Sequence, residues 1–233
     1  MQQHSLPEGY RACVIGASGA IGSAFVEVLQ NDVRCANVVA LHRNSMPALD
    51  LTDAHSIETA AEQIKSQGPF HLIIHAAGIL HQPDFMPEKR LADVNIEQMQ
   101  ATFMVNTFGP AMVLRYFSRL LDKQAGVFAL LSAKVGSIED NRLGGWYSYR
   151  ASKAALNMMI KTAAIEIKRT QPNTIVIAMH PGTVNSALSH PFRGAEIGRP
   201  AAQAAHEMLE VIDRLQAKDH ASFISYNGER LPW

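Results

Sequence analysis

The segment Arg11-Ala12-Cys13-Val14-Ile15-Gly16-Ala17-Ser18-Gly19-Ala20-Ile21-Gly22 carries the clearest architectural signal in this chain. Its first five residues form a short apolar run typical of a buried strand, and residues 21–30 place apolar side chains at helical spacing. Glycines at this position let the backbone turn tightly and approach a pyrophosphate, while the start of a helix supplies amides and positive partial charge. A glycine motif alone could be a flexible turn, but its place between a strand and a helix favours dinucleotide binding. The expected contacts are Gly16, Ser18, Gly19, Ala20, Ile21 and Gly22.

Beyond this segment, short apolar runs alternate with longer amphipathic ones. The sequence predicts strands at 11–15, 37–41, 48–51, 70–74, 126–131, 174–179 and 221–226, and helices at 21–30, 54–66, 96–123, 148–170 and 200–217. The runs at 70–74 and 126–131 lack polar alternation, as expected for strands covered on both faces. We therefore predict an α/β fold with a doubly wound, mostly parallel, seven-stranded sheet and helices on both faces. The irregular stretches 136–145 and 185–199 are expected to border a substrate, because such sheets bind ligands in loops at the carboxyl ends of their strands.

The end of the second predicted strand indicates which cofactor the site prefers. It reads Leu41-His42-Arg43-Asn44, with no acidic residue to bind ribose hydroxyls and with an arginine that suits a 2′-phosphate. This predicts NADP(H) in preference to NAD(H), with Arg43 holding the phosphate. The alternative is an ordinary exposed arginine after a strand.

Composition excludes several other classes of protein. The chain has 233 residues, 47% hydrophobic and 18% charged, and its 21 Lys+Arg balance its 21 Asp+Glu. Neither a basic field for nucleic acid nor an amphipathic anchor or apolar run for a membrane is present in the sequence. No histidine pair has helical metal-ligand spacing with a nearby third ligand, so no metal is expected. Two cysteines and no signal-peptide pattern favour a cytoplasmic location.

Tyr149 and Lys153 carry the main chemical signal. They lie four residues apart at the start of a predicted helix, so they share one face about 5–6 Å apart at Cβ. A fixed positive charge favours the phenolate and lowers a tyrosine's pKa, so this tyrosine could exchange a proton with a substrate oxygen. Taken alone, this spacing is more often an ordinary surface contact, and its significance depends on the surrounding motifs.

Read in order, these motifs resemble the short-chain dehydrogenase/reductase family, and most closely its C-factor-like, carbonyl-reductase-like branch. The resemblance runs almost end to end and includes the stretches Trp146-Tyr147-Ser148-Tyr149-Arg150 and Asn227-Gly228-Glu229-Arg230-Leu231-Pro232-Trp233. It implies a single-domain Rossmann fold over 1–233, with 185–199 as the substrate-binding loop. It also implies an oxidoreductase that transfers hydride between the nicotinamide and a carbonyl or secondary alcohol.

The resemblance further implies roles for individual residues. Tyr149 would be the proton donor, Lys153 would tune its pKa and bind the nicotinamide ribose, and Asn106 would hold a relay water. The remaining implied cofactor contacts are Asp50, Leu51, Ala76, Ala77, Gly78, Pro181, Gly182 and Val184. His75 and Ala76 replace the family's two asparagines before Ala-Gly. The catalytic serine is Ser132 or Ser137, with Ser132 favoured because the family motif begins with a serine at this strand end.

Substrate and assembly are less constrained by the sequence. Apolar residues expected at the pocket wall are Trp146, Leu143, Val184, Leu188, Phe192 and Leu80, which favour an apolar small-molecule carbonyl or alcohol. Each of them is also a plausible core residue. By resemblance, helices 96–123 and 148–170 pair across a two-fold axis, which implies a homodimer or homotetramer. Competing interpretations are a non-catalytic NADP-binding sensor and an extended-family epimerase or dehydratase, the latter disfavoured by the short stretch after Gly182.

Overall fold

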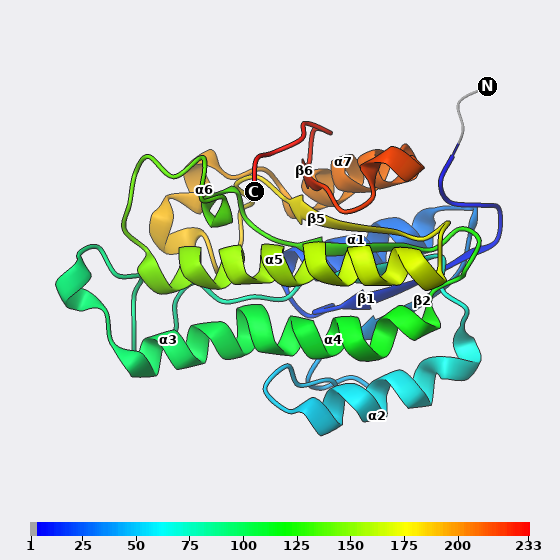
Figure 1. Ribbon diagram of the computed structural model, residues 1–233, viewed down its shortest axis with the longest axis horizontal. Helices are drawn as coiled ribbons and strands as arrows, with labels where there is room; N and C mark the ends of the chain where they lie inside the picture. The colour runs from blue at the N-terminus through cyan, green and yellow to red at the C-terminus, as the bar shows by residue number, and fades with distance from the viewer. Residues whose placement is uncertain (1–3) are drawn as a thin grey trace.

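The computed structural model describes residues 4–233 and contains a six-stranded parallel sheet (Figure 1). The strand order is β2-β1-β3-β4-β5-β6. The strands are β1 (Tyr10–Ile15), β2 (Cys35–Leu41), β3 (Leu72–His75), β4 (Val127–Leu131), β5 (Ile175–His180) and β6 (Phe223–Ser225). The order reverses between β1 and β3, which opens a crevice at the carboxyl ends of these strands.

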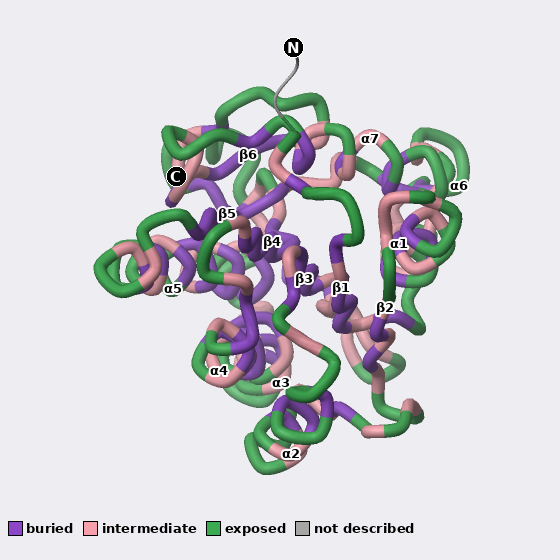
Figure 2. The backbone as a smooth tube through the Cα atoms, turned by 90° about the vertical axis from the view of Figure 1, so that its right-hand side faces the viewer, coloured by how far each residue is buried: buried purple, intermediate pink, exposed green. Residues whose placement is uncertain are grey.

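Helices cover both faces of this sheet (Figure 2). One layer contains α1 (Ala20–Asn31) and α7 (Ala201–Asp213), and the other contains α2 (Ala54–Ile64), α4 (Gly109–Phe117) and α5 (Tyr147–Thr170). Alternate side chains of β1 point to opposite faces of the sheet, and an apolar core lies on each face. Cys13 and Ile15 pack in one core, and Ala12 and Val14 pack in the other. Burial on both faces explains why the strands read as unbroken apolar runs. No helix within residues 4–233 combines the length and apolar character needed to cross a bilayer.

The predicted strand at 48–51 is wrong, and it accounts for the difference between seven strands and six. This segment makes no strand pairing in the described residues. Leu49 is buried in the core beside α2, while Asp50 turns to accept hydrogen bonds from the amide and hydroxyl of Thr52. A short apolar pattern predicts that Leu49 is buried, but it does not show whether the backbone pairs with another strand.

The helix predicted at 96–123 is divided into shorter elements. It consists of α3 (Ile96–Phe103), a π-helical turn over Met104–Phe108, α4 and a 3-10 turn over Ser118–Leu120. Pro110 follows the π-turn and has no backbone N–H to continue the regular ladder. A side chain at Gly109 would lie 2.5 Å from the carbonyl oxygen of Leu51, so the helix approaches the Asp50–Leu51 turn closely here. Such π-turns are frequent at functional sites, and this one carries Asn106.

Candidate active site

A cavity of about 520 Å³ lies at the carboxyl ends of β1, β2 and β3. Nine of the predicted cofactor residues line it: Gly16, Ser18, Gly19, Arg43, Asp50, Leu51, Ala76, Ala77 and Gly78. Ala20, Ile21, Gly22, Tyr149, Lys153, Pro181, Gly182 and Val184 do not line this cavity. His42, Thr52, Ile79, His81, Gln82, Pro83 and Val105 line it although the sequence did not single them out. These additional residues lie mostly in irregular segments, whose course no periodic pattern reveals.

Two glycines allow the close approaches around this cavity. Gly16 has φ +87°, and a Cβ there would lie 2.8 Å from the backbone nitrogen of Ala77. A Cβ at Gly22 would lie 2.1 Å from the carbonyl oxygen of Gly16. Any side chain at Gly22 would therefore push α1 away from the loop, and glycine is required for their contact.

The cavity fits a dinucleotide with an additional phosphate. Helix α1 begins after Gly19 with no side-chain cap and no acidic residue in its first turn, so its amides are available to an anionic group. The exposed Arg43 forms no ion pair with any residue described by the structure. Hydrogen bonds from Thr52 hold the pKa of Asp50 below its usual range, with a further contribution from the charge of Arg43. An anionic Asp50 at the cavity wall can accept hydrogen bonds from a polar ligand group.

Tyr149 and Lys153 lie on the first turns of α5, and both are buried. The Lys153 ammonium nitrogen is 5.9 Å from the centre of the Tyr149 ring and donates a hydrogen bond to the carbonyl oxygen of Leu131, 3.2 Å away. A Cβ at Gly78 would lie 3.3 Å from the same nitrogen. Lys153 therefore links the tyrosine to the glycine turn that lines the cofactor cavity.

Burial determines the protonation of this pair. It raises the pKa of Tyr149 to about 12 and lowers the pKa of Lys153 to about 8. The direction for Tyr149 is opposite to the one expected from a neighbouring ammonium, because loss of water around the phenolate outweighs the attraction of the charge. The phenol is thus neutral at physiological pH and carries a proton that it can donate.

Asn106 fixes the wall of the cavity with its side chain. Its Oδ1 accepts a hydrogen bond from the amide of Ile79 at 2.8 Å, and its Nδ2 donates to the carbonyl oxygen of Ile79 at 2.8 Å. Nδ2 also lies 3.2 Å from the hydroxyl of Ser152 on α5. The side chain therefore joins three segments around Lys153. The expected role in holding a water molecule stays a prediction.

The two candidate serines already have partners. Ser132 donates to Oδ1 of Asn157 at 2.6 Å, and Ser137 donates to the backbone oxygen of Trp233 at 3.2 Å. Among the described residues, neither hydroxyl is hydrogen-bonded to Tyr149. Their proposed contact with a substrate oxygen stays a prediction, and it requires the chosen hydroxyl to change its partner.

His75 at the end of β3 stands where the resemblance led us to expect an asparagine. The imidazole is fully buried, and neither ring nitrogen has a hydrogen-bond partner in residues 4–233. Burial, with a smaller contribution from the charge of Lys153, lowers the pKa of His75 to about 3. His75 is therefore neutral near Lys153, so it adds no second positive charge there.

The loop at 185–199 closes the other side of the site. It includes a 3-10 turn, His190–Phe192, and the short helix α6 (Gly194–Ile197). Phe192 packs on Trp146 with ring centroids 4.9 Å apart, and Trp146 packs on Tyr149 at 6.2 Å. Leu143 differs from the expectation for a pocket wall: it is 91% exposed in the loop before α5.

Arg199 holds the turn before this loop. Its guanidinium donates to the carbonyl oxygen of Pro181 at 2.5 Å and lies 3.5 Å from the centre of the Tyr226 ring. It also pairs with Glu207 of α7. Gly182 adopts φ +71°, and a Cβ there would meet both Arg199 and Tyr226 at 2.8 Å. These contacts fix the Pro181–Gly182 turn, which the sequence could assign only by resemblance.

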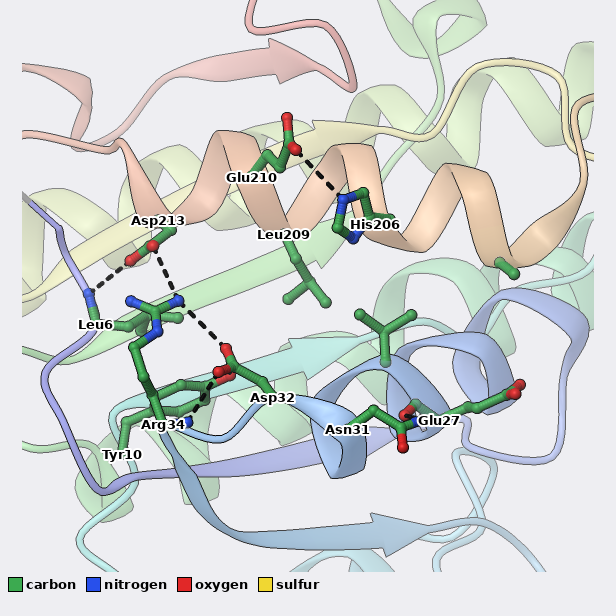
Figure 3. A pocket seen from close by; sticks show the side chains of 12 residues that line it. Leu6, Tyr10, Glu27, Asn31, Asp32, Arg34, His206, Leu209, Glu210 and Asp213 are labelled. Atoms are coloured by element: carbon green, nitrogen blue, oxygen red, sulfur yellow. Dashed lines mark hydrogen bonds and ion pairs between the residues drawn. The ribbon is translucent and has the colours of Figure 1, made fainter. Parts of the chain in front are cut away.

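A second cavity, of about 440 Å³, lies between α1 and α7 near the amino ends of the strands (Figure 3). Arg34 bridges Asp32 and Asp213 there, at 3.2 and 3.1 Å. None of the predicted site residues lines it. Within residues 4–233, no group of three or more His, Cys, Asp or Glu side chains is arranged to bind a metal ion.

Comparison with known proteins agrees with this geometry. A family model described as short chain dehydrogenase matches residues 11–196. A 1-hydroxy-2-glutathionyl-2-methyl-3-butene dehydrogenase of Rhodococcus sp. (strain AD45) is 30% identical over 80% of this chain and 79% of its own length. The C-signal protein of Myxococcus xanthus is 31% identical over 71% of this chain and 94% of its own. The fold is similar to that of an NADPH-bound carbonyl reductase from chicken fatty liver, with a TM-score of 0.83 at 22% identity, covering 99% and 96% of the two chains.

Proposed function

Because the chain belongs to the short-chain dehydrogenase family and is an NAD(P)-dependent oxidoreductase, we propose that it reduces a carbonyl group of an apolar small molecule with NADPH, or catalyses the reverse oxidation. The observation that carries this proposal is the pair formed by Tyr149 and Lys153. Both are buried on α5, and Lys153 reaches toward the Gly78 turn of the cofactor cavity. A tyrosine–lysine pair with a purely structural role would need no cofactor cavity beside it.

The residues that would hold the cofactor lie around the 520 Å³ cavity. The amides after Gly19 suit the pyrophosphate, and Arg43 suits a 2′-phosphate. Arginine binds phosphate through several N–H groups, which supports NADP(H) over NAD(H). The solved carbonyl reductase from chicken fatty liver is described with bound NADPH, which agrees with this choice.

When bound, the nicotinamide cofactor supplies or accepts the hydride. In the reductive direction the neutral phenol of Tyr149 donates its proton to the substrate oxygen, a contribution typically worth ~10²–10⁴ in rate. Lys153 lies on the cofactor side of Tyr149. After the phenol has donated its proton, Lys153 transfers a proton back to the tyrosine. The hydroxyl of Ser132, or alternatively of Ser137, orients the substrate oxygen. Asn106 keeps Ile79 and Ser152 in place around Lys153 and, as proposed from the resemblance, takes part in proton supply from solvent.

The loop 185–199 is the proposed substrate-binding loop. The packing of Phe192 on Trp146, and of Trp146 on Tyr149, supports an apolar substrate that enters between the loop and the phenol. Aromatic walls of this kind offer large apolar contact area with little loss of side-chain entropy.

The proposed assembly is a homodimer or homotetramer. Exposed apolar side chains gather on the π-turn and on α5, the two segments expected to pair across a two-fold axis: Met104, Phe108, Met158, Met159 and Ile165. An isologous contact would bury this surface on both copies. Light scattering after size exclusion measures the assembly directly.

The function is tested by following NADPH oxidation with a panel of aldehydes, ketones and quinones. Tyr149→Phe should lose nearly all turnover while it still binds NADPH, and Tyr147→Phe, two residues away and 38% exposed, is the matched control. Carbonyl reduction retained by Tyr149→Phe would refute the mechanism. NADPH binding without turnover of any compound by the unmodified protein would instead indicate a cofactor-binding sensor.

A further inference from the structure

Glu88 is a buried carboxylate that lies against the start of α5. It is only 2% exposed and belongs to the irregular segment between β3 and α3. Its Oε2 accepts a hydrogen bond from the amide of Ser148 at 3.2 Å, and its Oε1 accepts one from the Ser148 hydroxyl. Its backbone oxygen accepts from the amide of Trp146 at 2.5 Å. Three contacts therefore join this distant segment to one helix terminus.

Helix α5 has no cap of its own. Trp146 stands at the N-cap, in a left-handed conformation with φ 53° and ψ 45°, and gives no side-chain cap hydrogen bond. The first amides of a helix need acceptors, and a negative charge is favourable at this end of the helix dipole. Glu88 supplies both from a position 60 residues away in sequence. No cationic side chain among the described residues forms an ion pair with Glu88, so the polar partners of its carboxyl group are the amide and hydroxyl at the start of α5.

The capped turn carries the proposed proton donor. Ser148 immediately precedes Tyr149, so its two hydrogen bonds to Glu88 limit both the rotation and the axial position of the turn that holds the phenol. The segment that contains Glu88 also contains Ile79, which Asn106 fixes at the cofactor cavity. Glu88 thus joins the cavity wall to the tyrosine's helix.

We propose that Glu88 is a positioning residue that sets the orientation of the Tyr149 phenol relative to the cofactor cavity by capping α5 through Ser148. This inference rests on the proposed function, because it concerns the same proton donor. A displacement of about 1 Å in a reacting group can reduce a rate by about 10²-fold, so a small change in this cap is measurable.

The test uses Glu88→Gln, Ser148→Ala and the double variant in the full-length protein. Glutamine keeps the size of the side chain, but its amide group cannot accept at both positions. Glu88→Gln should reduce kcat by about 10-fold to 100-fold and raise the solvent deuterium isotope effect on kcat, while the NADPH dissociation constant stays within about 3-fold. Ser148→Ala should have a smaller effect, and the double variant should be no worse than Glu88→Gln. Glu97→Gln is the control, because Glu97 is an exposed carboxylate in the first turn of α3.

A purely structural role would give a different result. It would lower the concentration of active enzyme but leave the solvent isotope effect at the value of the unmodified protein. The effects of the two substitutions would then simply add in the double variant. That outcome would overturn the proposal. Unchanged kcat in Glu88→Gln would do so as well. If the unmodified protein reduces no carbonyl compound, the proposed function fails, but the cap is still measurable: amide hydrogen exchange at residues 147–150 should be about 10-fold faster in Glu88→Gln, and equal rates would refute the inference.

Discussion

The Ser132 hydroxyl is hydrogen-bonded to Oδ1 of Asn157, 2.6 Å away, and Asn157 lies eight residues beyond Tyr149 on α5. Eight residues correspond to about 12 Å of helix rise. The Ser132 hydroxyl is thus bound to a residue about two helical turns beyond Tyr149 on α5. Orienting a carbonyl oxygen would require the same O–H group to change its partner, since a hydroxyl has a single hydrogen to donate.

Replacing Ser132 should therefore affect both stability and turnover. Ser132→Ala leaves a buried amide oxygen without its donor, which should lower the free energy of unfolding by about 1–3 kcal/mol. If its hydroxyl also orients the substrate, kcat should fall by about 10²-fold. Urea unfolding and steady-state kinetics measure the two effects separately. Lost stability with unchanged kcat would transfer the role to Ser137, for which Ser137→Ala is the paired variant.

The rate of carbonyl reduction should fall in alkaline solution. Burial lowers the pKa of Lys153 to about 8 and raises that of Tyr149 to about 12, so the lysine loses its proton first as pH rises. We expect reductive kcat/KM to fall about tenfold per pH unit above about pH 8. Lys153→Arg should move this decline to higher pH in whatever activity remains, because a guanidinium keeps its proton. A profile that stays flat to pH 10 would show that the ammonium is not needed.

Arg43 should distinguish the two nicotinamide cofactors. Arg43→Ala should weaken NADPH binding by about 10-fold to 150-fold, the effect of losing about 1.5–3 kcal/mol from charged hydrogen bonds, and should change NADH binding little. Fluorescence titration of each cofactor measures this ratio. Arg169→Ala is the control, since Arg169 is exposed near the end of α5. Equal losses for both cofactors would contradict a phosphate-specific role.

His75 should make the protein sensitive to acid. Its pKa is lowered to about 3 by burial, whereas an unfolded chain binds this proton near pH 6.5. The unfolded state therefore binds more protons between these values, and the stability present above about pH 6.5 is lost as pH falls toward 3, by up to about 1.4 kcal/mol per pH unit. His75→Asn should reduce this slope in urea unfolding. His206→Gln, at an exposed position on α7, should leave it unchanged.

The sequence located the parts of the site that depend on local structure. The glycine loop and the Tyr149–Lys153 spacing could be placed because each lies in a short strand–turn–helix or helical pattern. The class of fold followed from strand–helix alternation and is confirmed, with one strand fewer than predicted. The break at Met104–Phe108 could not be seen, because apolar spacing is much the same in a helix with and without a π-turn.

Sequence patterns could not predict contacts between segments that lie far apart in the sequence. Glu88 meets Ser148 across 60 positions of sequence, and Arg199 meets Pro181 and Tyr226 in a similar way. Neither residue belongs to a periodic pattern or a motif. The direction of the Tyr149 pKa was also missed, because desolvation depends on how completely the folded chain covers the phenol.

The pairing of Val184 with Arg199 closes the loop between them at its base. The amide of Asn185 donates to the carbonyl oxygen of Arg199 at 2.9 Å, and the amide of Arg199 donates to that of Thr183 at 3.0 Å. The intervening segment thus leaves and rejoins the scaffold at one fixed point. Because this segment is the proposed substrate-binding loop, exchanging it between homologues is expected to change substrate preference while the sheet and the proposed proton donor are kept.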